Sequence, residues 1–201
     1  MSRRGFTLIE LLVVVSILAV LVAAVFPAYT AIRRSQRVKR VEATVEALAG
    51  GVAAYQNDFG IGPPANPPTS LVPAGTNLGN RSVVFFLRLG EAAHGKSAPY
   101  LPSKFYNEFL QIKYNVLLDE WDRPYVYFDT AAMKSGPGPL YDVLDRAGNS
   151  PSPVPPAVKG ATDYYNIGGY QILSCGPNQR YDGGRNLHTS EADDIANFVP
   201  E

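Results

Sequence analysis

The first 60 residues carry two successive hydrophobic patterns. From Phe6 to Phe26 the chain reads FTLIELLVVVSILAVLVAAVF, an unbroken apolar run with one charged side chain, Glu10. An apolar run of about 20 residues is long enough to cross the hydrocarbon core of a bilayer as a helix. We therefore predict a transmembrane helix over residues 6–27.

Beyond Pro27 the apolar positions recur at spacings of three and four, which is typical of a polar helix with one buried face. The stripe consists of Val38, Val41, Val45, Leu48, Val52 and Tyr55. We predict that an amphipathic helix over residues 28–58 continues the first helix and packs on a sheet. Gly50-Gly51 predicts a weak point and a bend, and Asp58-Phe59-Gly60 predicts the end.

For the remaining residues, 59–201, we predict a loop-rich α+β head domain. Glycine (18) and proline (17) are concentrated after residue 59, which favours short strands between turns. Ser82–Glu91 predicts a short helix. Glu120–Tyr127 predicts a turn and a strand, and Tyr164–Ser174 predicts one or two more strands.

Charge is balanced over the chain, with 18 basic and 18 acidic residues, but it is unevenly distributed. Residues 1–40 hold seven basic side chains and one acidic side chain. Subtraction leaves 11 basic and 17 acidic side chains for residues 41–201, a net charge of −6. An acidic main domain disfavours nucleic-acid binding.

Catalytic motifs are missing from the sequence. His94 and His188 are the two histidines, and no zinc-protease, phosphate-loop or dinucleotide pattern occurs. Cys175, the single cysteine, excludes an internal disulfide and could in principle pair with His188 as a nucleophile. A lone cysteine on an apolar strand is more often buried and inert, so we expect no enzyme.

A short basic leader precedes the apolar run. Across their junction the chain reads Arg3-Arg4-Gly5-Phe6-Thr7-Leu8-Ile9-Glu10. A carboxylate at bilayer depth costs about 3 kcal/mol unless it is paired or near the interface. Glu10 lies about one helical turn after Phe6. If the bond after Gly5 is cut, the new Phe6 amine can neutralise Glu10 in the same chain or in a neighbour. Alternatively, Glu10 simply favours the positive helix N-terminus.

This string resembles the type III signal of prepilins and pseudopilins. In that family a membrane peptidase cuts after the leader's Gly and methylates the new N-terminal Phe. The resemblance implies a leader of residues 1–5, cleavage between Gly5 and Phe6, and N-methylation of Phe6. It also implies an assembly role for Glu10 and a helix-bending proline at Pro27.

Three C-terminal segments resemble the major pseudopilin of type II secretion. They are Trp121–Tyr125, Ser174–Asn178 and Asp194–Phe198. The resemblance covers about residues 1–60 and 119–199, and it departs at Asn178, where an Asp is usual, and in the long loop 178–193. That family binds calcium in this loop, which implies Asn178, Asp182, Asp193 and Asp194 as ligands. Calcium takes about six to eight oxygens; the alternative is a solvated acidic loop.

The predicted fold is therefore α+β and pilin-like. A long N-terminal helix, membrane-spanning in its first half, packs on a small antiparallel β-sheet domain with a C-terminal loop region. We expect a pseudopilin that polymerises into the type II secretion pseudopilus. The alternatives are a type IV or competence pilin and a non-polymerising, membrane-anchored calcium-binding domain.

The expected partners are further copies of the chain, minor pseudopilins, inner-membrane secretion proteins and a prepilin peptidase. The expected location is the bacterial inner membrane, crossed once, with the head domain in the periplasm and the filament periplasmic or at the cell surface. Five basic residues at 33–40 conflict with this orientation, because the positive-inside rule places the more basic flank in the cytoplasm. We expect this stretch to lie near the outer headgroups or to pair with acidic faces of neighbouring subunits.

Overall fold

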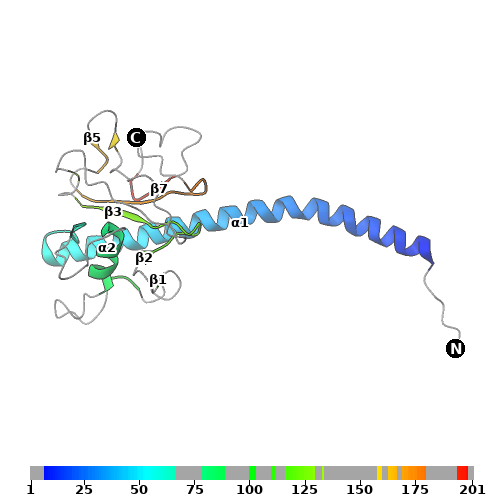
Figure 1. Cartoon of the computed structure of the whole chain (residues 1–201), viewed down its shortest axis with the longest axis horizontal. Coiled ribbons are helices and arrows are strands. Elements are labelled where there is room, and N and C mark those ends of the chain that lie inside the picture. The colour runs from blue at the N-terminus through cyan, green and yellow to red at the C-terminus, as the bar shows by residue number, and fades with distance from the viewer. Residues whose placement is uncertain are drawn as a thin grey trace. The chain divides into compact units, whose positions relative to one another are not determined.

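The protein has an α+β fold in which a long helix is followed by a small antiparallel sheet. The computed structural model describes residues 7–66, 78–88, 100–102, 110–111, 116–129, 133, 158–159, 163–166, 169–179 and 194–198. The helices are α1 (Leu8–Phe59) and α2 (Leu78–Arg88). The strands are β1 (Leu110–Gln111), β2 (Val116–Leu117), β3 (Val126–Phe128), β4 (Val158–Lys159), β5 (Asp163–Tyr164), β6 (Gln171–Ser174) and β7 (Ile195–Ala196). Figure 1 shows α1 as one ribbon running from blue to cyan.

The chain divides into two compact units, Met1–Lys39 and Arg40–Glu201. In the first unit α1 is solvent-exposed along its described length, apart from the half-buried Val38. This part of α1 is apolar enough to cross a membrane, with a mean hydropathy of 3.0 and no buried residue in its most apolar window. The helix continues through Pro27, whose carbonyl accepts a hydrogen bond of 2.8 Å from Thr30 Oγ1.

In the second unit α1 buries the predicted apolar stripe. Its buried residues are Val41, Thr44, Val45, Leu48, Gly51, Val52 and Tyr55. The valine, leucine and tyrosine side chains among them share one core with Tyr127 and Leu173 of the sheet. Tyr170 Oη also donates a hydrogen bond of 2.8 Å to the carbonyl of Ala49. The prediction of an amphipathic helix packed on a sheet is therefore confirmed.

Helix α1 passes through Gly50-Gly51 without interruption. Gly51 is buried, and a Cβ there would lie 3.1 Å from Leu87 Cδ1, so its small size allows α2 to approach closely. The helix ends at Phe59, as predicted. Gly60 follows at φ 72° and donates its N–H to the Gln56 carbonyl, which is a glycine C-cap.

The central sheet has the strand order β3-β6-β7, with both pairs antiparallel. Tyr127 is opposite Ile172, and Ser174 is opposite Ile195. Every residue of β3 and β6 is buried, which means that both faces of these strands are covered. Strands β1–β2 and β4–β5 form two separate antiparallel pairs. The strands predicted near residues 120–127 and 164–174 are thus present.

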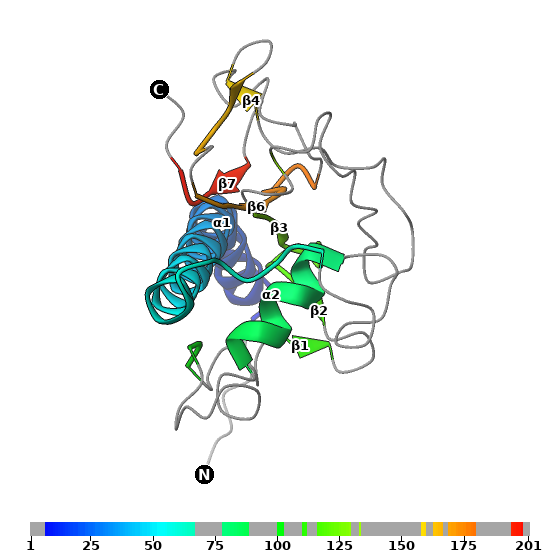
Figure 2. The same ribbon diagram turned by 90° about the vertical axis from the view of Figure 1, so that its left-hand side faces the viewer.

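Helix α2 packs against β2 and β3 (Figure 2). It begins at Leu78, four residues before the predicted start, and its last residue is Arg88; Glu91 lies outside the described residues. Gly79 and Asn80 are weak helix formers, yet tertiary contacts hold both. The Asn80 side chain accepts from Leu117 N–H at 2.8 Å and donates to the carbonyls of Leu117 and Tyr125.

Candidate functional site

The N-terminus of α1 is capped by three reciprocal hydrogen bonds between Thr7 and Glu10. The Glu10 carboxylate accepts from the Thr7 N–H at 2.9 Å and from the Thr7 hydroxyl at 2.7 Å. The Glu10 N–H donates to Thr7 Oγ1 at 3.3 Å. This is a capping box, in which two N-terminal backbone donors are satisfied by side chains.

The capping box gives Glu10 a role that the sequence analysis missed, although the Thr-x-x-Glu spacing of Thr7 and Glu10 predicts it. It supports the interpretation that Glu10 favours the helix N-terminus. Gly5 and Phe6 lie outside the described residues, so the pairing of Glu10 with a Phe6 amine stays a prediction. The Glu10 side chain is exposed, and its carboxylate is therefore accessible to a further cation.

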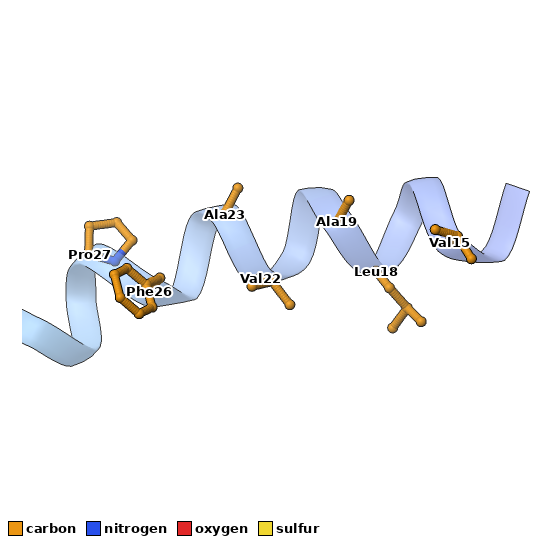
Figure 3. Close-up of a pocket in the computed structure, with 7 residues that line it drawn as sticks. All are labelled: Val15, Leu18, Ala19, Val22, Ala23, Phe26 and Pro27. Carbon is orange, nitrogen blue, oxygen red and sulfur yellow. The ribbon is translucent and has the colours of Figure 1, made fainter. Parts of the chain in front are cut away.

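The C-terminal half of the apolar segment has a shallow, open pocket (Figure 3). It is lined by Val15, Leu18, Ala19, Val22, Ala23, Phe26 and Pro27. Ala19 and Ala23 lie one turn apart, and small side chains at this spacing let another helix approach closely. This surface has the shape and chemistry of a helix-packing face.

In the second unit, a buried carboxylate organises the turn that precedes β3. Asp119 is 5% exposed. Its Oδ1 accepts from the N–H groups of Trp121 and Arg123, both at 2.9 Å, and its Oδ2 accepts from Ser174 Oγ at 2.6 Å. The Asp119 N–H donates to the Arg123 carbonyl at 2.7 Å. The turn is thereby fastened to the end of β6.

Burial raises the pKa of the Asp119 carboxyl, while the hydrogen bonds from Ser174, Arg123 and Trp121 act in the opposite direction. Cys175, next in the chain, is also buried, and burial raises the pKa of its thiol, with a further contribution from the charge of Asp119. A thiol with a raised pKa is a poor nucleophile. This environment agrees with an inert cysteine; His188 lies outside the described residues.

The structure brings together the three C-terminal segments that resemble the major pseudopilin. Asp119 links the Trp121–Tyr125 turn to Ser174, and β6 pairs with β7. The Asn197 side chain accepts from Ile172 N–H at 2.7 Å, and the Asn197 N–H donates to the Ile172 carbonyl at 3.1 Å. The Tyr165 and Phe198 rings stack at 5.0 Å. The three segments therefore meet around one small sheet: the first leads into β3, the second begins at the last residue of β6, and the third contains β7.

Two of the four predicted calcium ligands are described. Asn178 is exposed in the turn after β6, and the partly exposed Asp194 directly precedes β7. Ser174 at the end of β6 pairs with Ile195 at the start of β7. Asn178 and Asp194 therefore lie near the same end of the β6–β7 pair. Asp182 and Asp193 lie outside the described residues. The described residues contain no group of three or more aspartate, glutamate, histidine or cysteine side chains that could hold a metal ion.

Residues 1–26 match the family model of the prokaryotic N-terminal methylation motif. This motif is the type IV pilin-like prepilin signature, and it implies processing by a prepilin peptidase and self-assembly. No curated protein and no solved structure matches the chain. The motif and the apolar helix together support a membrane-anchored, type IV pilin-like subunit.

Proposed function

We propose that this chain is a structural subunit, a pseudopilin, that polymerises into the type II secretion pseudopilus. Cleavage between Gly5 and Phe6 and methylation of Phe6 precede assembly. The proposal rests mainly on the apolar half of α1, which carries the prepilin motif and buries none of its large side chains within the chain.

Assembly follows from the need to keep this surface out of water when the subunit leaves the membrane. Residues from Leu8 to Ile32 include many large apolar side chains that are about half exposed or more. Full burial of a large apolar side chain contributes up to about 1.5–3 kcal/mol relative to full exposure. In the inner membrane lipid covers this surface, and in a filament identical helices replace the lipid. A neighbouring subunit's Phe6 amine then neutralises Glu10, which would otherwise be a costly charge in an apolar bundle.

The head domain favours a pseudopilin over a type IV or competence pilin. The three segments that resemble the major pseudopilin meet around one sheet, which the Asp119–Ser174 and Ile172–Asn197 hydrogen bonds help to hold together. The head domain holds one cysteine, so a cysteine pair cannot fasten its C-terminal loop. Calcium bound by Asn178, Asp182, Asp193 and Asp194 is the proposed substitute.

Deletion of the gene in its host tests the choice of machine. We expect the exported proteins to accumulate in the periplasm, while surface motility and DNA uptake stay normal. Re-expression of the intact chain should restore secretion, and the Glu10→Ala variant should not. Normal secretion with lost motility or DNA uptake would assign the chain to a pilus or competence machine instead.

A further inference from the structure

Three exposed arginines follow the apolar run on helix α1. We call Arg33, Arg34 and Arg37 the arginine cluster. At 100° per residue their directions fall within about 100° of one another, so they share one helix face. Within residues 7–39 the only acidic residue is Glu10, at the opposite end of this segment. The cluster therefore concentrates positive charge that no carboxylate of this segment neutralises.

An aromatic side chain lies directly before the cluster. The guanidinium carbon of Arg33 lies 5.0 Å from the centre of the Tyr29 ring, which is a cation–π contact. Tyrosine is enriched where a membrane helix passes from hydrocarbon to water, because its ring is apolar and its hydroxyl is polar. The Tyr29–Arg33 pair has the chemistry of an interfacial anchor.

The position along the helix places the arginine side chains within reach of the lipid headgroups. The segment from Phe6 to Phe26 is about 31 Å long, close to the hydrocarbon thickness of about 30 Å. Tyr29 lies about 5 Å beyond Phe26, and Arg33 and Arg34 lie about 10–12 Å beyond it. The headgroup layer on each side is about 5–7 Å thick. Arginine side chains extend back along apolar surface toward such an interface.

We propose that the arginine cluster binds the phosphates of anionic lipid headgroups where α1 leaves the membrane. The planar guanidinium matches a phosphate with two parallel hydrogen bonds. These contacts hold the subunit at a fixed depth before it enters a filament. The proposal rests on the membrane anchoring of the proposed function and is independent of filament assembly.

A second copy of the chain is the competing partner, because residues 41–201 carry a net charge of −6. The depth of Arg33 and Arg34 and the contact with Tyr29 favour the lipid. If the cluster paired with an acidic surface of a second copy, it would need neither a position within reach of the headgroups nor an aromatic residue at the hydrocarbon boundary.

The test uses the full chain reconstituted in phosphatidylcholine vesicles with spin-labelled lipid probes. Electron paramagnetic resonance measures how strongly spin-labelled phosphatidylglycerol and phosphatidylcholine associate with the protein. We expect phosphatidylglycerol to be preferred by about fivefold, the ratio given by about 1 kcal/mol from one fully engaged arginine. The preference should fall as salt is raised.

Three variants make the result specific. Arg33→Gln/Arg34→Gln/Arg37→Gln should remove most of the preference, whereas the corresponding triple Lys variant should keep a measurable part of it. Arg88→Gln is the matched control. It removes an exposed positive charge at the end of α2, in the second unit, and should leave the preference unchanged.

An equal association of both lipids with the wild-type chain overturns the proposal, as does a triple Gln variant that keeps the preference. Cross-linking between copies that depends on the cluster, without lipid preference, assigns the cluster to the acidic surface of a second copy. Failure of the chain to float with the vesicles refutes the anchoring itself and is recognised separately.

Discussion

The side chains of Asp119 and Ser174 form a buried hydrogen bond of 2.6 Å between residues 55 positions apart in the chain. Through it the turn before β3 is fixed to the end of β6, which in turn pairs with β7. The sheet thus depends on a carboxylate that no local sequence pattern singles out.

Replacing Asp119 by Ala should destabilise the second unit by about 3 kcal/mol, because two backbone N–H groups and the Ser174 hydroxyl lose their acceptor in a buried site. Urea unfolding of the detergent-solubilised chain, followed by the fluorescence of Trp121, measures the loss. Asp122→Asn removes a neighbouring exposed carboxylate and is the control. Equal stability of Asp119→Ala and wild type would contradict the role of this turn.

The stability difference between wild type and Asp119→Asn should depend on pH. Burial raises the folded-state pKa of Asp119 above its unfolded value of about 3.9. The stabilising contribution of the protonated carboxyl is then fully present below pH 3.9 or so and is lost as pH rises through the folded pKa. The advantage of wild type over the variant should be larger at pH 3 than at pH 7. An advantage that grows with pH would show that the hydrogen bonds outweigh burial.

Two glycines in helices should respond in opposite ways to alanine. Gly50 is exposed with open space around its Cα, so Gly50→Ala should stabilise the protein by about 0.8 kcal/mol through helix propensity. A Cβ at Gly79 would collide with the Tyr127 carbonyl oxygen, so Gly79→Ala should cost about 2 kcal/mol. The same Trp121 signal measures both. A stabilising Gly79→Ala would mean that α2 does not pack on β3 in this way.

Glu10→Ala should abolish filament formation in cells that contain the prepilin peptidase, as judged by sedimentation and subunit cross-linking. Thr7→Ala is the matched control, because it removes the cap, at about 1 kcal/mol, but keeps the carboxylate. We expect Thr7→Ala to assemble. If both variants fail equally, Glu10 acts through the cap and the amine-pairing hypothesis is wrong; if Glu10→Ala assembles, the chain resembles a plain anchor.

Calcium should raise the melting temperature of the intact chain relative to the same sample in chelator. Asp194→Asn should remove most of this shift, because it deletes a carboxylate ligand next to β7, whereas the exposed Glu46→Gln should not. An identical melting temperature with and without calcium would contradict calcium binding and favour the alternative, a solvated acidic loop.

The sequence predicted the elements whose signals are local. The spacing of Val41, Val45 and Leu48 predicts the buried face of α1, and Gly60 predicts its end, because both follow from helix geometry. The start of α2 was predicted too late, since Gly79 and Asn80 are weak helix formers that only contacts with β2 and β3 stabilise.

The candidate site was predicted less completely than the fold. The Thr7–Glu10 cap was readable from its spacing but was missed. The Asp119–Ser174 bond could not be predicted, because it joins distant residues through tertiary packing alone. Gly5, Phe6, Asp182 and Asp193 lie outside the described residues, so their assigned roles remain predictions.

The central claim is that this chain is processed and assembled as a pilin-like subunit. The most direct measurement is the intact mass of the protein extracted from membranes of cells with and without the prepilin peptidase. We predict a mass that begins at Phe6 and carries one methyl group, formed only when the peptidase is present. A chain that still begins at Met1 in the presence of the peptidase, or one cut near residue 26, would contradict the claim.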